Sequence, residues 1–223
     1  MRRSFFVLCL LASPLALAQQ NISKVNGGVR AEAGSRYGDL STVNGSIKVE
    51  SGASVRDVET VNGSISVAEN ARVGDTETVN GSIAIGENVV VDGDLETVSG
   101  RIDVGAGSRV NGAVEAVNGT ITLTRAEITG SVEGVNGGIT LKGSTVGGNV
   151  TSVNGDILIG RDAVVRGDIV VHKPKGFSFG KSDPPKVTIE AGATVEGRLV
   201  FKREVTLSVD PGAKVAHSEP VER

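Results

Sequence analysis

The sequence predicts an all-β fold, a single-stranded three-sided β-helix of about nine to ten coils, each roughly 18–19 residues long. The motif Val-Asn-Gly, once Val-Ser-Gly, occurs eight times at nearly even spacing, beginning at Val25, Val43, Val61, Val79, Val98, Val117, Val135 and Val153. Repetition at a fixed period is typical of solenoids, in which each unit buries its apolar face only by stacking on its neighbours. Aromatic residues make up 3% of the chain and Trp is absent, so the predicted interior is narrow.

The first segment, residues 1–18, has the three parts of a secretory signal: two arginines, an apolar run, and a small-x-small cleavage sequence ending at Ala18. We therefore expect an exported bacterial protein of the periplasm, the cell surface or the extracellular space. We expect no transmembrane segment, because no stretch approaches the roughly 20 apolar residues of a membrane span. Cleavage would remove the single cysteine, Cys9, and change the formal net charge from −3 to −5, which argues against nucleic acid as a partner.

The second segment, residues 19–216, is predicted to form the β-helix. In a strand, residues two apart lie on one face. Each repeat unit carries three such aliphatic pairs, which predict three short strands joined by tight corners. The unit that begins at Val79 has as its expected inward positions Ile83, Ile85, Val89, Val91, Leu95 and Val98.

The motif itself is predicted to form a corner of each coil. Asn-Gly follows a Val that we expect to face inward, at a place where the chain needs a positive φ that Asn and Gly tolerate. Asn-Gly is also typical of β-hairpins, but hairpins do not explain the strict register of buried columns from one unit to the next. The predicted structural corner residues are Asn44, Gly45, Asn62, Gly63, Asn80, Gly81, Asn118, Gly119, Asn136, Gly137, Asn154 and Gly155.

Residues 172–186 (HKPKGFSFGKSDPPK) replace a short corner, so we expect one projecting loop there. Aromatic side chains ringed by positive charge can anchor a partner, for example a cell-wall glycan or another envelope protein. Packing of both Phe rings on the flank of the rod is the alternative. Residues 217–223 are expected to form a disordered tail. The candidate partner-binding residues of the loop are Phe177, Phe179, Lys175 and Lys181.

Three stretches of the repeat resemble the bactofilins, a family of polymer-forming bacterial cytoskeletal proteins: IGENVVVDGDLETV (85–98), RDAVVRGDIVV (161–171) and VTIEAGATVEGRLVF (187–201). The resemblance implies a three-sided, right-handed β-helix that polymerises end to end without a nucleotide. The chain departs from the family pattern in carrying a secretory signal. It is also similar to secreted bacterial β-strand-repeat proteins that are grouped as adhesins.

The six-residue rhythm of the aliphatic positions also resembles the hexapeptide repeat of left-handed β-helices, many of which are acyltransferases. Seven-residue corners at 91–98 and 110–117 break that rhythm, so the right-handed form is favoured over the left-handed one. The acyltransferase resemblance would imply a catalytic His between coils, and the chain has two histidines, His172 and His217. The sequence has no Ser/His/Asp set and no metal-spaced His/Cys cluster, so we expect neither catalysis nor a cofactor.

Two columns of acidic residues recur in the units, on either side of an expected inward position, and both are predicted to face solvent. Carboxylate oxygens are ligands that Ca²⁺ prefers, so a bridged acidic stripe is one interpretation. The favoured interpretation is a solvated stripe that neighbouring arginines partly neutralise, with no firm metal site. The candidate metal ligands are Asp57, Glu59, Asp75, Glu77, Asp94 and Glu96.

These features predict a non-catalytic structural or scaffold protein of the bacterial cell envelope that self-associates end to end through its terminal coils, because the end strands of an open rod lack partners. The first alternative is a monomeric secreted adhesin, or a glycan- or protein-binding module, that uses the loop at 172–186. The second is a hexapeptide-type acyltransferase or a polysaccharide-active β-helix enzyme.

Overall fold

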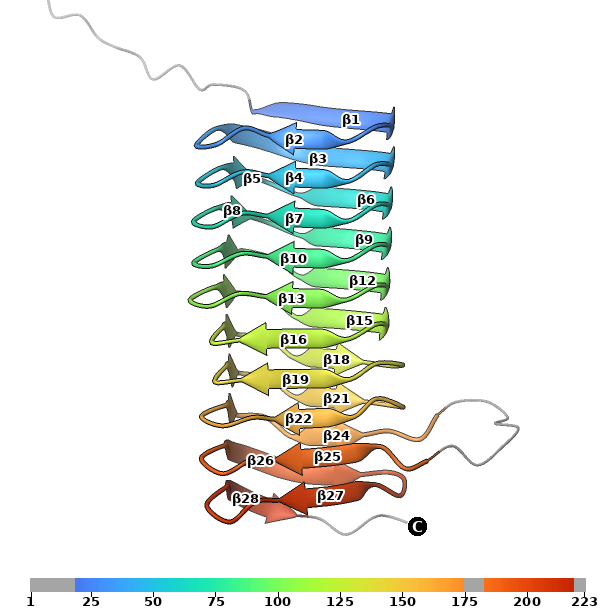
Figure 1. Cartoon of the computed structure of the whole chain (residues 1–223), viewed down its shortest axis with the longest axis vertical. Coiled ribbons are helices and arrows are strands. Elements are labelled where there is room, and N and C mark those ends of the chain that lie inside the picture. Colours follow the sequence, from blue (N-terminus) through green and yellow to red (C-terminus); the bar gives the residue numbers. More distant parts are fainter. Residues whose placement is uncertain (1–18, 175–182, 219–223) are drawn as a thin grey trace, which may run out of the picture.

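The computed structural model describes residues 19–174 and 183–218, which form an all-β parallel solenoid of about ten turns without a helix. Figure 1 shows the coils stacked along the long axis, with the N-terminal coil at one end and the C-terminal coil at the other. The predicted fold class is confirmed, whereas the handedness and the three-sided cross-section stay predictions. The predicted signal, residues 1–18, lies outside the described residues.

Ten strands form one parallel sheet, in which each strand between the two end strands pairs with its equivalent in the coils before and after it. Its strands are three or four residues long because a corner ends each of them. They are β2 (Val29–Ala31), β4 (Ile47–Val49), β7 (Ile65–Val67), β10 (Ile83–Ile85), β13 (Ile102–Val104), β16 (Ile121–Thr124), β19 (Ile139–Lys142), β22 (Ile157–Ile159), β25 (Lys186–Ile189) and β27 (Thr206–Val209).

The other sheet has 18 strands, which lie in two stacked columns. Four long strands run through both columns: β1 (Gln20–Asn26), β3 (Arg36–Asn44), β26 (Thr194–Phe201) and β28 (Lys214–Ser218). The two-residue column holds β5 (Ser54–Val55), β8 (Arg72–Val73), β11 (Val90–Val91), β14 (Arg109–Val110), β17 (Glu127–Ile128), β20 (Thr145–Val146) and β23 (Val164–Val165). The motif column holds β6 (Val58–Asn62), β9 (Thr76–Asn80), β12 (Leu95–Ser99), β15 (Val114–Asn118), β18 (Val132–Gly134), β21 (Val150–Ser152) and β24 (Ile169–Val171).

The interior consists of stacked aliphatic side chains in register between coils. Ile83, for example, pairs with Ile65 on one side and with Ile102 on the other, and all three are fully buried. Five of the six inward positions predicted for the unit that begins at Val79 are buried. The sixth is wrong, because Val98 is 44% exposed. The parity of the strand explains the difference: Leu95 and Thr97 point inward, so Val98 points outward.

The predicted positive φ at the Asn-Gly corner is also wrong for most coils. Among the motif glycines, only Gly27 (φ 98°) and Gly100 (φ 154°) have such a φ. The left-handed residues lie instead at a different corner, one in each coil, where Asn70 (φ 60°) and Asn88 (φ 55°) are equivalent to Gly52 (φ 68°). The left-handed corner is the set Gly34, Gly52, Asn70, Asn88, Gly107, Arg125, Gly143, Asp162, Gly192 and Gly212.

The motif glycine is needed for a different reason, which is the close approach of successive coils. A Cβ atom on Gly63 would lie 2.0 Å from the carbonyl oxygen of Gly45, and one on Gly81 would lie 1.9 Å from that of Gly63. Real Cβ atoms do not occupy such positions, so each coil requires Gly where its backbone rests on the backbone of the preceding Gly.

The Asn and Thr of the motif provide hydrogen bonds between coils. Asn62 Nδ2 donates to Asn44 Oδ1 at 3.0 Å, and Asn80 Nδ2 donates to Asn62 Oδ1 at the same distance. The buried Thr78 Oγ1 donates to the carbonyl oxygen of Gly63, one coil earlier, at 2.9 Å. The Thr and Asn side chains of the motif therefore bond neighbouring coils to each other, in addition to the backbone ladder of the parallel strands.

Two predicted boundaries change. β28 continues to Ser218, so the solenoid extends past the predicted start of the tail at His217, and residues 219–223 lie outside the described residues. The predicted loop at 172–186 does separate β24 from β25, although Lys186 already belongs to β25. Its middle, residues 175–182, lies outside the described residues.

Candidate functional site

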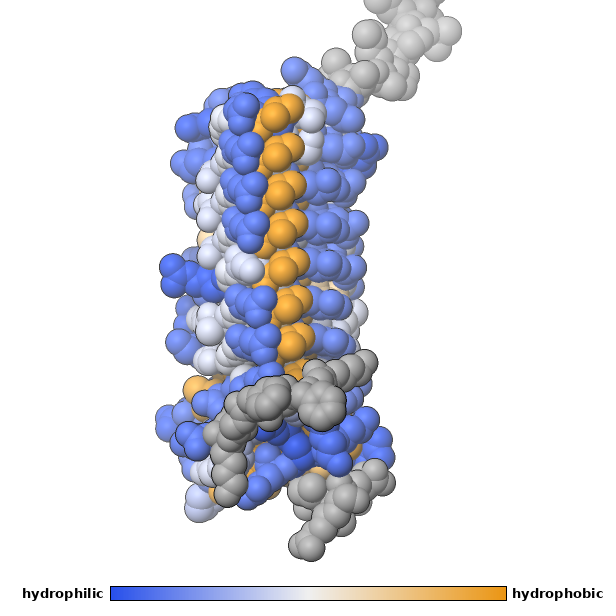
Figure 2. All heavy atoms as spheres, turned by 90° about the vertical axis from the view of Figure 1, so that its right-hand side faces the viewer, coloured by the Kyte–Doolittle hydropathy of each residue, from blue (hydrophilic) through white to orange (hydrophobic). Residues whose placement is uncertain are grey.

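A stripe of exposed valines runs along the rod. The motif valines of six successive coils are 40% to 67% exposed. Figure 2 shows them as a continuous apolar stripe between polar flanks. Val135 and Val153 extend the column and are half-buried. The six exposed valines, here called the valine stripe, are Val25, Val43, Val61, Val79, Val98 and Val117.

Strand propensity alone does not account for the valine stripe. Val favours strands, and the same preference would apply at the outward-facing middle position of each strand in the ten-stranded sheet. The residues at that position, however, are chemically varied. There the equivalent residues of successive coils include Lys48, Ser66, Ala84, Asp103 and Thr122. The fold accepts any of these residues in one column but carries Val in eight successive coils of another, from Val25 to Val153. Interior packing does not require this apolar column, because its side chains point outward. Contiguous exposed apolar surface of this kind is typical of contact sites.

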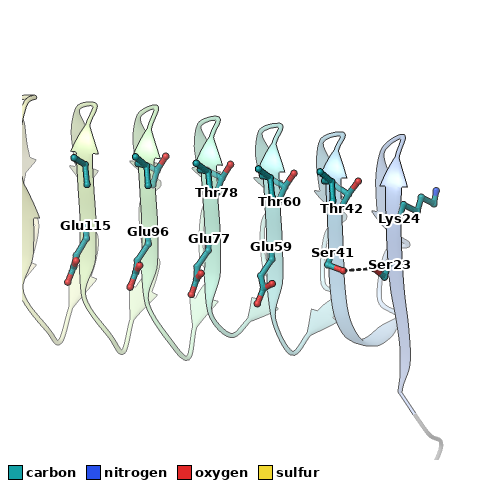
Figure 3. Close-up of a pocket in the computed structure, with 16 residues that line it drawn as sticks. Ser23, Lys24, Ser41, Thr42, Glu59, Thr60, Glu77, Thr78, Glu96 and Glu115 are labelled. Carbon is teal, nitrogen blue, oxygen red and sulfur yellow. Dashed lines mark hydrogen bonds between the residues drawn. The ribbon is translucent and has the colours of Figure 1, made fainter.

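A row of glutamates lies beside the valine stripe, two residues earlier in each strand. Glu59, Glu77 and Glu96 occupy directly opposed positions on β6, β9 and β12, and the row continues through Glu115 and Glu133. All five side chains are exposed, as predicted for this acidic column. Figure 3 shows the first four in one line across neighbouring strands, with their carboxylates on the same side.

The valine stripe and the glutamate row border a shallow groove along the strands, here called the valine–glutamate groove. It has a volume of about 380 Å³ and extends from β1 to β15. Buried threonines, such as Thr60 and Thr78, lie between its two edges, and Ser23 and Lys24 lie at its N-terminal end. The Lys24 ammonium donates to the carbonyl oxygen of Gly28 at 2.8 Å. The groove thus combines one apolar edge with one acidic edge.

Partial burial and neighbouring negative charges raise the pKa of two glutamates in this row. Partial burial, followed by the negative charges of Glu96 and Glu59, raises the pKa of Glu77. Partial burial together with Glu133 and Glu96 raises the pKa of Glu115. No ion pair to a glutamate of this row occurs among the described residues. A cation placed along the row would relieve this repulsion.

Stability should therefore rise as the pH falls from 7 to about 5. The folded chain binds protons at Glu77 and Glu115 more readily than the unfolded chain does, so protonation favours folding on this side of the ordinary glutamate pKa. Asp39 and Asp168 act in the opposite direction, because hydrogen bonds from Arg56 and Arg198 lower their pKa values. The stability that these two aspartates contribute is lost only below about pH 4, as the pH falls through their lowered pKa values.

The matched test is the double variant Glu77→Gln/Glu115→Gln. We expect it to raise the free energy of unfolding by about 0.5–1 kcal/mol at pH 7, because it removes like charges that face each other on adjacent strands. The gain should shrink at pH 5, and urea unfolding at both pH values measures it. Glu87→Gln, at an exposed site outside the row, is the control. Equal effects of the control and the double variant would contradict this account.

The aspartates of the second acidic column have a structural role. Asp57 Oδ1 accepts the backbone N–H of Asp75 at 3.3 Å, and Asp75 Oδ1 accepts that of Asp94 at 2.9 Å. Among the described residues, no group of three or more His, Cys, Asp or Glu side chains is arranged to hold a metal ion. The six candidate ligands thus differ in role: carboxylates of the Asp column accept hydrogen bonds from backbone N–H groups, and the Glu side chains form an exposed row.

The other predicted site residues are placed as follows. Phe177, Phe179, Lys175 and Lys181 lie outside the described residues. His172 follows β24 and is half-buried, and His217 lies in β28. No described helix is long and apolar enough to span a membrane. The valine stripe was missed, although the alternation Glu-Thr-Val in a five-residue strand would have placed Thr inside and Val outside.

Comparisons with known proteins gave no match to a family model, to a curated protein or to a solved structure. The described residues form a parallel β-helix of about ten stacked coils.

Proposed function

We propose that this protein is a non-catalytic structural rod that associates end to end through its terminal coils. The observation that carries the proposal is the exposed apolar face of the last coil. Leu207 and Val209 of β27 are 42% and 43% exposed, although they continue the column in which Val187 and Ile189 are fully buried.

The C-terminal coil supplies the apolar half of such a contact. Among the described strands, β27 pairs with β25 alone and β28 pairs with β26 alone, so each has one free edge. Free edges of this kind pair with other strands unless something blocks them. A further coil placed here would cover Leu207 and Val209 and continue both sheets.

The N-terminal coil offers a matching edge. Among the described strands, β2 pairs with β4 alone, and its Val29 and Ala31 belong to the same inward column as Leu207 and Val209. In a continued register, β27 of one copy would lie on β2 of the next, with Leu207 against Val29 and Val209 against Ala31. A head-to-tail contact between two different surfaces generates a filament when successive copies continue along one axis, as the continued register of the two sheets requires here.

The proposed setting is the bacterial cell envelope, in the periplasm or at the cell surface. It is supported by the signal-like sequence at residues 1–18. The resemblance of residues 85–98, 161–171 and 187–201 to bactofilins, and the implied right-handed three-sided coil, support a polymer. The expected absence of catalysis, cofactor and nucleic acid is part of the proposal.

The test is negative-stain electron microscopy of the purified chain across a range of concentrations. We expect filaments one rod wide at high concentration, and we expect Leu207→Lys/Val209→Lys to abolish them, because each copy would then place two charges in the contact. Ser66→Lys/Ala84→Lys adds the same charges to the flank of the rod and should leave filaments intact. Isolated short rods at every concentration would rule out the proposal.

The second candidate is a monomeric secreted adhesin or a glycan- or protein-binding module. The valine–glutamate groove favours it, because a rod that only stacks end to end does not need a repeated apolar column on its flank. If the variant Leu207→Lys/Val209→Lys forms no filaments but still binds a glycan or protein partner, this second candidate is supported over the first.

A further inference from the structure

We propose that the valine–glutamate groove of one copy binds residues 173–185 of a second copy. The contact uses the flank of the rod, so it is independent of end-to-end stacking and holds whether or not filaments form. Its consequence is a side-by-side association of rods.

The groove selects its occupant by charge and polarity. Its acidic edge carries four glutamates, Glu59, Glu77, Glu96 and Glu115, in one unbroken row. Its other edge is the valine stripe. A suitable occupant therefore carries cationic groups and apolar side chains together in an extended form, so that both edges are contacted at once. Direct contact between two bare grooves would bring glutamates close to glutamates, which like-charge repulsion opposes.

The chain itself contains one segment of this composition. KPKGFSFGKSDPP, residues 173–185, has three lysines, two phenylalanines and a single acidic residue, in a protein whose formal net charge is −3. Bound in an extended form, the segment would present Phe177 and Phe179 on one face, since residues two apart share a face. The phenyl rings would lie on the valine stripe, and the ammonium groups of Lys175 and Lys181 would reach the glutamate row.

The described residue that precedes this segment, His172, places its start at the corner that carries the valine stripe. The backbone N–H of His172 donates to the carbonyl oxygen of Ser152 at 2.9 Å. His172 therefore occupies, one coil later, the position that Val153 has in its own coil. The motif column ends there: Arg203 Nη1 donates to the carbonyl oxygen of Val153 at 3.0 Å and to Asn154 Oδ1 at 2.9 Å. The segment thus leaves the rod on the face that holds the groove.

The length of the segment favours binding to the groove of a second copy over binding to the groove of the same copy. A 13-residue excursion that must return to the rod extends at most about 20–25 Å, at 3.3–3.6 Å per residue. The strand with Glu115 lies three coils from His172, about 14 Å away, and the strand with Glu59 lies six coils away, about 29 Å at about 4.8 Å per coil. One copy could bring only the tip of its own segment to the near end of the groove. A neighbouring rod can lay the whole segment along it.

Two rods that lie antiparallel would make this contact twice. Each would insert its segment into the groove of the other, which is the reciprocal arrangement of a two-fold symmetric pair.

Carbodiimide cross-linking tests the proposal, because it joins lysines to carboxylates that are in direct contact. An equal mixture of ¹⁴N- and ¹⁵N-labelled full-length chains distinguishes links between copies from links within one copy. We expect Lys175 and Lys181 to link to Glu77, Glu96 and Glu115, with about half of the linked peptide pairs carrying mixed isotopes. We also expect the yield to fall at least fivefold in 0.5 M salt, since surface charge contacts are screened.

A charge exchange supplies the matched variants. One chain carries Lys175→Glu/Lys181→Glu and the other carries Glu77→Lys/Glu96→Lys. Each alone should lose at least four-fifths of the cross-links, and their mixture should regain links between the exchanged positions. Glu77 and Glu96 are exposed, and Lys175 and Lys181 belong to the predicted loop. Thermal unfolding should therefore remain within a few degrees of the parent chain, which checks that the fold is intact.

Three results would overturn the proposal. Links confined to a single isotope would show that each chain binds its own segment. Links from Lys175 and Lys181 to glutamates outside the row, such as Glu32 and Glu87, at equal yield would show unspecific contact. Absence of recovery in the mixture of exchanged variants would show that the pairing of segment and groove does not depend on charge, and would leave the groove to a different partner.

Discussion

Gly81→Ala is expected to destabilise the rod by about 3 kcal/mol or more, which is at or above the usual range for an overpacked site. The added Cβ would lie 1.9 Å from the carbonyl oxygen and 2.5 Å from the carbonyl carbon of Gly63. Both of these are backbone atoms that parallel pairing holds in place on either side of the corner. No side chain can move aside, so the spacing of two coils must change. The shift in the urea unfolding midpoint measures the cost.

The matched control is Gly52→Asn at the left-handed corner. Gly52 has φ of 68° and open space where a Cβ would lie, and Asn already occupies the equivalent position in the next two coils, as Asn70 and Asn88. We expect a cost below about 1 kcal/mol, since Asn tolerates this conformation. Gly81→Asn distinguishes a requirement for positive φ from a backbone clash. If the motif required Gly for a positive φ, Asn would be tolerated at this position. If the Cβ atom clashes with the backbone of the preceding coil, Asn should be as costly as Ala.

The architecture could be predicted from the sequence because solenoid packing repeats in the sequence itself. The even spacing of the motif, as from Val43 to Val61, predicts the coil, and the pairs Ile83/Ile85 and Val89/Val91 predict where strands face inward. The structure places the side chains of both pairs in the core. The interruption at 172–186 was also visible, because its lysines and prolines break the aliphatic pattern.

The orientation of the motif could not be predicted in the same way. In Glu-Thr-Val, hydrophobicity alone favours burying Val, and the prediction followed it. The parity of the strand instead buries Thr78, whose hydroxyl is satisfied by the Gly63 carbonyl oxygen in the preceding coil. A buried hydroxyl is acceptable only with such a partner, and that partner is 15 residues away in sequence. The valine edge of the candidate site was missed for the same reason, because this parity leaves the motif Val outside. The glutamate edge was predicted to face solvent, and its side chains are exposed.

The glycine of the motif illustrates a second limit. Asn-Gly is so strongly associated with positive φ that a corner of this type was expected. The structure uses the two residues differently: the Asn side chains form a ladder between coils, and the Gly allows backbone to rest on backbone. The ladder is interrupted where Ser99 stands between Asn80 and Asn118. Stacking contacts of this kind join residues a whole coil apart, so local turn statistics do not contain them.

A comparison of Ile83→Ala with Val79→Ala tests the orientation of the motif directly. Ile83 is fully buried between Ile65 and Ile102, so its truncation leaves a cavity and should cost about 2–5 kcal/mol. Val79 is 41% exposed on the valine stripe, so its truncation should cost less than about 1 kcal/mol, as is usual for surface positions. Urea unfolding of both variants at one pH gives the two values.

The two variants also separate stability from association. Val79→Ala removes apolar surface from the middle of the valine–glutamate groove, so it should lower the yield of cross-links between copies while leaving the unfolding midpoint nearly unchanged. Ile83→Ala should lower the midpoint and leave the groove surface in place. Equal costs for both variants would mean that Val79 packs in the interior, and the valine stripe would then be neither an exposed surface nor a binding edge.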